Sequence, residues 1–502
     1  MPPKKRNTES KGKSQTKRRK KQNDVIEEFE EDSEGELDNT NNGTETDETY
    51  DVTLEGSMLT GELLISGGTN WDLVGRKSLP KGGININDCP GQVKSLFGQV
   101  KLWVDLSDRA TKNAGGPNLW RPHRMSSLVG VKIRSAISGC TACHSVIITA
   151  DGKAMTFGRN DCGQLGQGDL NRRDLPTEVP LLQGLNIVDA CCGKNHTLFL
   201  TDKGHVYACG DNKMGQLGLG HQSSTILVPT KISYKGPPVR KVAGGGEFSM
   251  MADIRGNLYS FGCPEYGQLG HNTDGKYFVT SNKMSFRCET RPRKVNVFIE
   301  KARDGHIVPV TDVEVRELAC GANHTAIIDS KKRVFTWGFG GYGRLGHAEP
   351  KDEMVPRHLK FFDGPNRGAT QIHAGSTFTL ATNEYGALYM WGINKAVGEA
   401  AMYPKLVQDL SGWRIRSVGC CNKSIVVAAD ESLISWGPSP TYGELCYGED
   451  KAKSSTTPQE VKTLYGGYIQ SVGCGYGHTL LIFRADSEED KVKIEKINVF
   501  TP

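Results

Sequence analysis

The sequence of 502 residues contains no run of about eighteen apolar residues, the length that a helix needs to cross a bilayer. Its basic N-terminus is not followed by an apolar stretch, so we expect no secretory signal peptide. No nucleophile elbow, paired-carboxylate motif or phosphate-binding loop stands out. These absences argue against a membrane span, secretion and catalysis, and we expect no cofactor and no enzyme active site.

The chain has fourteen cysteines, but their spacing does not indicate a metal or haem site. Cys140, Cys143 and His144 match the Cys-x-x-Cys-His spacing of covalent haem attachment. However, Cys and His recur at the places of Cys140 and His144 elsewhere in the chain without a second cysteine. Each such turn offers at most two or three ligands, fewer than a closed zinc site needs. We therefore expect reduced, buried cysteines and no bound metal.

One sequence pattern recurs along most of the chain and is clearest in Val315–Gly346. A turn of small residues with Cys320 leads to His324, which opens a β-branched run. A second run ends in Trp337-Gly338, and the glycine loop Gly343–Gly346 closes the unit. A fixed period of this kind is the signature of a repeat architecture.

Seven copies of this unit follow one another with a period of about 50 residues, apart from one longer interval after the third copy. The fifth copy lacks the glycine loop, and the sixth has a degraded form, Gly443-Glu444-Leu445-Cys446. The marker residues, which fill the place of His324, are His144, His196, Phe248, His324, Phe378, Ser424 and His478. Because the same His recurs in most copies, we interpret it as structural rather than catalytic. We expect these rings to satisfy backbone groups at turns.

Each unit has the pattern of β-strands, with hairpin turns such as Asp151-Gly152. A four-stranded unit cannot bury both faces alone, whereas seven arranged radially can. The sequence thus predicts an all-β, seven-bladed propeller. The seventh copy stops after Val472–Phe483, and Gly61–Gly75 resembles the missing half of a repeat. We therefore expect the N-terminal strands to close the last blade.

The period, the Cys-Gly-x-x-His turn and the Gly-x-Leu-Gly loop resemble the regulator of chromosome condensation repeat over about residues 60–485. The resemblance is strongest to the telophase-disc branch of that family, through Tyr259–Asn272, Phe335–Arg357, Gly412–Ser417 and Ile434–Pro440. It implies a propeller that acts on small GTPases. The exchange residues of the founding member find no match here.

The resemblance also implies a mitotic and cytoskeletal regulator. Its expected partners are small GTPases of the Rac, Ral or Ran type, which it would bind in a nucleotide-free form or activate by nucleotide exchange. Importin, spindle microtubules and centromeric chromatin or DNA are further expected partners. The expected locations are the nucleus with its nucleolus, mitotic chromosomes and the spindle, and partly the cytoplasm. An alternative is a chromatin or microtubule adaptor with no GTPase activity. A channel enzyme would need several carboxylates or His at one ring position, which the repeats do not show.

The first 59 residues have the composition of a disordered tail in two parts. Residues 1–23 carry a net charge of +9, and residues 24–55 contain fourteen acidic residues and no Lys or Arg. Ser33 lies in an acidic context that an acid-directed kinase would recognise. We expect the acidic part to fold back and weaken DNA binding by the basic part. Nuclear import or nucleic-acid contact is expected from the clusters Lys4, Lys5, Arg6, Lys17, Arg18, Arg19, Lys20 and Lys21.

Two segments break the repeat rhythm, and residues 486–502 form a C-terminal extension. Residues 77–124 are interpreted as an excursion that packs on the disc, with an exposed aromatic and basic surface as the alternative. Residues 271–311 are either a binding loop or a hairpin of Val295–Ile299 with Ile307–Thr311 that widens one blade. The partner-binding residues predicted in this insertion are Lys283, Phe286, Arg287, Glu289, Arg291 and Arg293.

Overall fold

The structure, a computed structural model, describes residues 50, 52–76, 116–302, 304–394, 399–438 and 441–502. The predicted import clusters, Ser33 and most of the acidic block lie outside these residues, as does most of the 77–124 excursion. No helix within the described ranges is long and apolar enough to cross a membrane.

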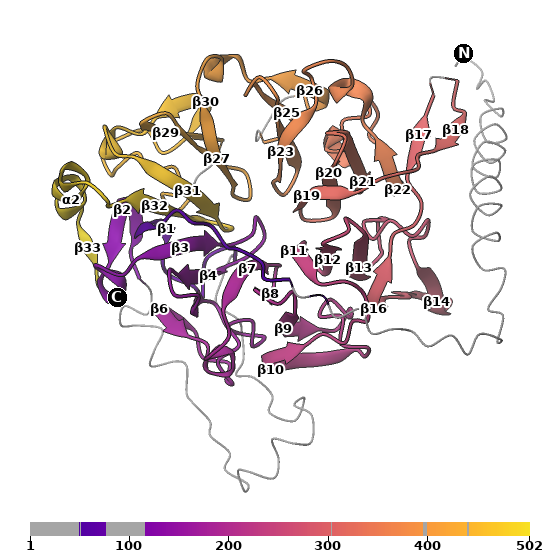
Figure 1. The fold of residues 1–502 in the computed structure, drawn as a ribbon, viewed down its shortest axis with the longest axis horizontal. Coiled ribbons are helices and arrows are strands. Elements are labelled where there is room, and N and C mark those ends of the chain that lie inside the picture. The colour runs from indigo at the N-terminus through magenta and orange to yellow at the C-terminus, as the bar shows by residue number, and fades with distance from the viewer. Residues whose placement is uncertain (1–49, 51, 77–115, 303, 395–398, 439–440) are drawn as a thin grey trace, which may run out of the picture.

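Seven four-stranded units surround a common axis, which confirms the predicted propeller (Figure 1). Blades 1 to 3 run from the innermost to the outermost strand as follows. Blade 1 contains β3 (Ile133–Ile137), β4 (His144–Thr149), β5 (Ala154–Gly158) and β6 (Arg173–Glu178). Blade 2 contains β7 (Ile187–Cys192), β8 (His196–Thr201), β9 (Val206–Asn212) and β10 (Ser223–Lys231). Blade 3 contains β11 (Val239–Gly244), β12 (Phe248–Asp253), β13 (Leu258–Gly262) and β16 (Glu289–Lys294).

Blades 4 to 6 repeat the same up-and-down order, and short 3-10 turns follow their outermost strands. Blade 4 contains β19 (Val315–Cys320), β20 (His324–Asp329), β21 (Val334–Gly338) and β22 (Glu353–His358). Blade 5 contains β23 (Ala369–Ala374), β24 (Phe378–Asn383), β25 (Leu388–Gly392) and β26 (Ala401–Leu406). Blade 6 contains β27 (Ile415–Cys420), β28 (Ile425–Ala429), β29 (Ser432–Gly437) and β30 (Ser455–Glu460).

Blade 7 joins both ends of the chain, as the sequence predicted. β31 (Ile469–Cys474) and β32 (His478–Arg484) come from the C-terminal side, and β1 (Gly61–Gly68) pairs antiparallel with β32 along its length. The outer strand is β2 (Asn118–Met125), so the predicted excursion ends too late: its last residues are an ordinary blade strand. The long segment between β1 and β2 separates β2 from its repeat, so the repeat period alone does not predict this strand.

The C-terminal extension packs on the same blade. Helix α2 (Glu488–Glu495) begins at Ser487, whose hydroxyl accepts a hydrogen bond from the Asp490 backbone N–H. The short strand β33 (Val499–Phe500) then pairs parallel with β2, and Phe500 is buried in the blade core. The extension therefore covers the outer edge of the blade that closes the ring.

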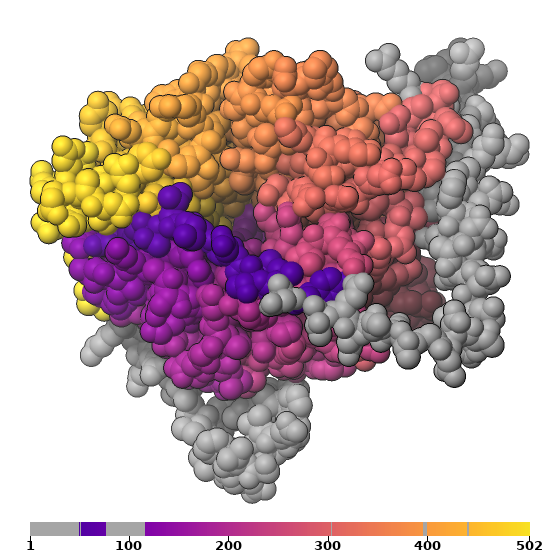
Figure 2. Space-filling model, in the orientation of Figure 1, coloured from indigo at the N-terminus to yellow at the C-terminus, as the bar shows by residue number. Residues whose placement is uncertain are grey.

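The predicted disorder of residues 1–59 is wrong for its last part. Residues 52–59, here called the strap, run from β1 across the face of blades 1 to 3 (Figures 1 and 2, indigo). The Leu54 backbone N–H donates to the Asp202 carbonyl at 2.7 Å, and the Leu54 side chain packs against the core of blade 2. Apolar, backbone and hydroxyl contacts of Thr53 and Leu54 thus dock the end of the tail on blade 2.

The long interval after the third copy contains three different elements. The hairpin of β14 (Lys276–Thr280) and β15 (Lys283–Phe286) forms a sheet of its own, and β16 is the ordinary outer strand of blade 3. The hairpin of β17 (Ile299–Lys301) and β18 (Ile307–Pro309) widens blade 4 through parallel pairing with β22. The predicted hairpin is present with shorter strands, but the single predicted loop is not.

The repeated His side chains link neighbouring blades. His144 Nε2 lies 2.8 Å from the Thr197 hydroxyl of the next blade, and His478 Nε2 lies 2.7 Å from Ser145 across the closure. Thr197 donates its own proton to the Gln164 carbonyl at 2.6 Å, so His144 Nε2 carries the proton of this bond. The rings of His144 and His196 also have backbone hydrogen bonds with His196 and Phe248, as expected, but their contacts across the junction are with side-chain hydroxyls.

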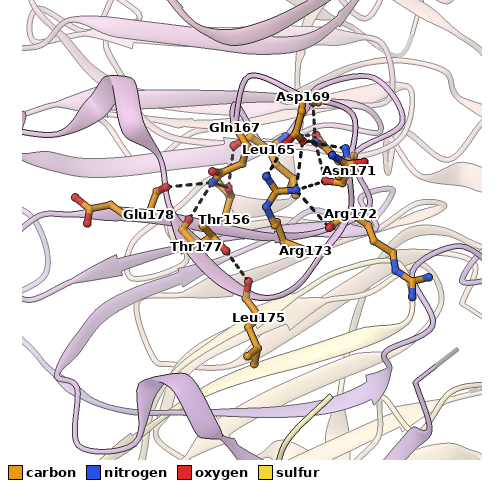
Figure 3. A network of polar contacts seen from close by, with 11 residues as sticks. Thr156, Leu165, Gln167, Asp169, Asn171, Arg172, Arg173, Leu175, Thr177 and Glu178 are labelled. Carbon is orange, nitrogen blue, oxygen red and sulfur yellow. Dashed lines mark hydrogen bonds and ion pairs between the residues drawn. The ribbon is translucent and has the colours of Figure 1, made fainter. Parts of the chain in front are cut away.

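Where they are present, the glycine loops follow the third strand of a blade and pack against the next blade. In blade 1 the Thr156 hydroxyl donates to the Leu165 carbonyl, and Gln167 Nε2 donates to Thr156 and to the Thr177 carbonyl (Figure 3). Gly163 and Gly166 have positive φ of 73° and 68°, which suits glycine. Their Cα atoms lie against β10 of blade 2, where a Cβ would collide.

Candidate partner-binding surfaces

The hairpin β14–β15 presents large apolar side chains to solvent without any core of its own. Phe278 is 73% exposed, and Tyr277, Val279 and Met284 are also exposed. A two-residue turn, Ser281-Asn282, joins the strands, with Thr280 opposite Lys283. An isolated hairpin is marginally stable in water, so its exposed apolar residues are not explained by folding alone.

The base of this hairpin is fixed to two blades. The Asn272 backbone N–H donates to the Met354 carbonyl of blade 4 at 3.0 Å, and Arg287 N–H donates to the Gly275 carbonyl at 2.7 Å. On the return side, Cys288 Sγ lies 3.8 Å from Met214 Sδ of blade 2. The hairpin therefore projects from a rigid base near the junctions of blade 3 with both of its neighbours.

The structure divides the six predicted binding residues between two adjacent elements. Lys283 and Phe286 lie on β15, and Arg287 lies in the link to β16. Glu289, Arg291 and Arg293 lie on β16, whose pairing with β13 is irregular between Glu289 and Arg293.

The charge of this surface is mainly positive. Arg293 pairs with Glu289 at 2.8 Å, and the Arg291 guanidinium covers Gly220 of blade 2. Lys283 and Arg287 are exposed and form no ion pair with any residue that the structure describes. The hairpin and the edge of β16 thus form one apolar and basic surface, here called the hairpin surface.

Sequence reasoning missed all four exposed apolar residues as site residues: Tyr277, Phe278, Val279 and Met284. The signal was present, since β-forming residues flank Ser281-Asn282 at the spacing of a two-residue hairpin. The predicted site consisted instead of charged residues and Phe286 on β15, on β16 and in the link between them.

The axis of the ring carries a polar cluster that the repeat comparison did not reveal. Asp189, Lys241 and Glu317 fill one position on β7, β11 and β19, the first residue after a bulge in each innermost strand. Lys241 pairs with Glu317, and burial raises the pKa of Asp189 to about 6. Two carboxylates and one ammonium thus share a ring position, whereas a channel enzyme was expected to show several carboxylates or His there.

The charge of Lys241 in this axial cluster also acts on a His of blade 5. The His373 ring lies on β23, where burial and the Lys241 charge lower its pKa to about 4 and keep it neutral. Within the described ranges, no three His, Cys, Asp or Glu residues are arranged to hold a metal ion. The bonded Lys241–Glu317 pair is an arrangement that stabilises adjacent blades rather than an acid and base poised for proton transfer.

Comparison with known proteins shows one consistent likeness. The model of the RCC1-like domain matches residues 97–481. Protein RCC2 of Mus musculus is 54% identical over 451 residues, which cover 90% of this chain and 82% of that protein. Protein RCC2 of Homo sapiens is also 54% identical, over 90% of this chain and 81% of that protein.

Solved structures share the same architecture. Yeast RCC1 (Prp20), solved with bound Kap60, superposes with a TM-score of 0.64 at 20% identity and covers 88% of this chain and 92% of its own. Prp20p from Saccharomyces cerevisiae, studied for its binding to Gsp1p and histones, gives a TM-score of 0.62 at 20% identity, covering 88% and 95%. At this identity the likeness concerns the fold alone.

Proposed function

The chain belongs to the RCC1-like domain family, and on that premise we propose that it is a mitotic and cytoskeletal regulator that binds a small GTPase through the hairpin surface. The bound GTPase is held in its nucleotide-free form or releases its nucleotide faster, because the hairpin binds one nucleotide state more tightly than the other. The protein itself transforms no substrate.

The observation that carries this proposal is the hairpin β14–β15. Phe278 and Met284 are large, apolar, exposed and opposite each other in the strand register. Such side chains on a rigid projection are suited to enter an apolar pocket of a partner, while the arginines around them bind acidic residues at its rim. GTPase switch regions change conformation with the bound nucleotide, so a hairpin that contacts them can bind one nucleotide state more tightly than another.

Further partners are proposed from the family and from the tail. Prp20p binds Gsp1p and histones, and yeast RCC1 binds Kap60. We propose that this chain likewise uses a GTPase and, through the basic clusters of residues 1–23, an importin. Nuclear and nucleolar localisation, with transfer to centromeres and spindle microtubules in mitosis, forms part of the same proposal.

A second candidate function is a chromatin or microtubule adaptor without GTPase binding. Exposed basic residues on β16 and the basic tail favour it, because both bind polyanions by charge alone. If the chain is an adaptor, its affinity for the partner should depend strongly on salt and not on Phe278. If it is a GTPase regulator, its affinity for the GTPase should depend on the Phe278 side chain.

Nucleotide release tests the two functions directly. The full chain is titrated into a panel of small GTPases loaded with a fluorescent guanine nucleotide, and binding to the nucleotide-free forms is measured in parallel. We expect one GTPase to bind and to lose binding about tenfold or more with Phe278→Ser plus Met284→Ser, since both anchors are removed. Tyr385→Ser, at an equally exposed aromatic position in blade 5, is the matched control and should have no effect. Absence of binding to every nucleotide-free GTPase rejects the proposed function.

A further inference from the structure

Two cysteines face each other where the hairpin β14–β15 returns to blade 3. Cys263 directly follows β13, and Cys288 directly precedes β16. These two strands are antiparallel with Gly262 opposite Glu289, so the next residues along the register that oppose each other are Cys263 and Cys288. Both are free thiols.

The two chain segments stay close beyond the cysteines. Pro264 and Arg287 both border Gly275, where a Cβ would lie 2.5 Å from Pro264 Cγ and 2.9 Å from the Arg287 carbonyl oxygen. Opposing residues of antiparallel strands have Cα atoms about 4.5–5.5 Å apart, and disulfides span about 4.4–6.8 Å between Cα atoms. A disulfide between these cysteines therefore needs no change in the pairing of the strands.

The two thiols differ in exposure and in acidity. Cys263 is 2% exposed, whereas Cys288 is only partly buried. The Cys263 thiol donates a hydrogen bond that lowers the pKa of Cys288, and this effect outweighs burial and the charges of Glu247 and Glu289. The same hydrogen bond, together with burial, raises the pKa of Cys263. An accessible thiolate beside a second thiol is the arrangement found in redox-sensing cysteine pairs.

A second pair of neighbouring cysteines lacks this asymmetry. Cys421 and Cys474 are 0% and 5% exposed, and a hydrogen bond with Cys474, together with burial, raises the pKa of Cys421 well above its usual value. Burial likewise raises the pKa of Cys140 and Cys446 to about 12. Proximity alone thus does not make a thiol of this chain reactive, and the buried pair serves as an internal comparison.

From the strand register and the exposure of Cys288 we propose that Cys263 and Cys288 are a modification site, at which a hydroperoxide converts the two thiols to a reversible disulfide. The Cys288 sulfur attacks one peroxide oxygen, the O–O bond breaks, and the other oxygen leaves with a proton as water or alcohol. Cys288 is then a sulfenic acid. The Cys263 sulfur attacks the Cys288 sulfur, the S–S bond forms, and the sulfenic hydroxyl leaves with the Cys263 proton as water. The two sulfurs together lose the two electrons that the peroxide gains.

The disulfide would fix the return side of the hairpin to the third strand of blade 3. Cys288 lies two residues after Phe286, the last residue of β15, so the bond is formed at the base of the hairpin. A dithiol reductant reverses the bond by thiol–disulfide exchange. The bond forms or fails to form whatever protein the hairpin surface binds, so this inference is independent of the proposed function.

Mass spectrometry of the full chain tests the site. The reduced protein is treated with hydrogen peroxide for increasing times, its remaining thiols are blocked with N-ethylmaleimide, and it is digested without reductant. We expect a linked peptide pair that contains Cys263 and Cys288, that forms about tenfold or more faster than any product at Cys421 and Cys474, and that disappears after treatment with dithiothreitol. Met214 Sδ, 3.8 Å from Cys288 Sγ, is the competing sulfur, and its sulfoxide is measured in the same digest.

Three variants assign the steps. Cys263→Ser keeps a hydrogen-bond donor but removes the second thiol, so a sulfenic acid should accumulate at Cys288 and be trapped by dimedone. Cys288→Ser should abolish both the disulfide and the dimedone product at this site, and Cys421→Ser, the matched control, should leave the linked peptide unchanged. The unchanged chain provides the first result without any variant. The proposal is overturned by absence of the linked peptide from that chain, by equally fast oxidation of Cys421 and Cys474, or by oxidation of Met214 in place of Cys288.

Discussion

The two hairpins between blades 3 and 4 differ in how they use their apolar residues. In β17–β18, Ile299 is 1% exposed, Phe298 packs edge to face on Phe335 at 5.4 Å, and the strand joins the sheet of blade 4. In β14–β15, Phe278 and Met284 face solvent and the strands pair only with each other. One insertion extends the core, and the other leaves its apolar surface free for a partner.

The difference teaches that insertion into a repeat does not by itself indicate function. Both hairpins interrupt the same interval, and both contain aromatic and charged residues. What separates them is whether a neighbouring strand offers a free edge: β22 does for β17, through Ile299 opposite Arg357. The four predictions below test whether stability belongs to the ring and its packed hairpin, and partner binding to the free hairpin.

The largest effect is expected from pH, and it should affect the ring and spare the free hairpin. Burial lowers the pKa of His144 to about 3 and of His196 and His478 to about 4, and that of His324 well below its usual range. The unfolded chain binds these protons near pH 6.5, so stability is complete above that pH and is lost as the pH falls below it. At pH 5.5 each ring lowers the free energy of unfolding by about 1.4 kcal/mol, or roughly 6 kcal/mol for four.

Urea unfolding between pH 7.5 and 5.5 measures this loss. His196→Gln keeps a side-chain donor but cannot titrate, so its stability should fall less with pH than that of the unchanged chain. An equal pH dependence in the variant would contradict the assignment of a buried neutral ring at this position.

The second effect separates the two hairpins by stability. Phe298→Ala should lower the free energy of unfolding by about 3 kcal/mol, because it leaves a cavity against Phe335. Phe278→Ala should change it by less than about 0.5 kcal/mol, since that ring is exposed. Thermal or urea unfolding measures both, and equal losses would mean that β14–β15 is packed in solution.

The third effect separates them by binding. Phe278→Ala should weaken binding of the partner GTPase about tenfold, as expected for an aromatic anchor, while folded Phe298→Ala should bind normally. Surface-immobilised nucleotide-free GTPase reports both affinities. If Phe298→Ala were the weaker binder at a temperature where it is folded, the packed hairpin would be the binding element.

The smallest effect is expected at the charged rim of the packed hairpin. The Lys360 ammonium holds the pKa of Glu300 below its usual range, and His358 lies 3.6 Å from the same carboxylate. Because the pair is largely exposed, Glu300→Gln should cost no more than about 1 kcal/mol, and less in high salt. A urea midpoint series with and without 1 M salt (about a 3 Å Debye length) checks the salt dependence.

The fold was largely predictable from sequence, because each repeat carries its own hairpin signals and glycine loop. The closure by Gly61–Gly68 was predictable for the same reason, since half of a repeat was missing at one end and present at the other. β2 and β16 were not recognised as blade strands, because long insertions separate them from their hairpin partners and remove the period as a guide.

The candidate surfaces were harder to predict. The predicted partner-binding residues lie on the consecutive strands β15 and β16 and the link between them, but exposure, not residue type, distinguishes Phe278 from Phe298. The axial cluster arose from a bulge that turns Asp189, Lys241 and Glu317 inward, and no local pattern marks that bulge.

The closure of blade 7 also determines when its strands can pair during protein synthesis. β1 begins at Gly61, but its partner β32 ends at Arg484, so the first strand emerges long before the last is translated. At about 5–20 residues per second, the nascent chain waits roughly 20 to 80 s with that strand unpaired. Until blade 7 closes, the ring has two open edges, and loss of residues at either end of the ring removes strands of this same blade.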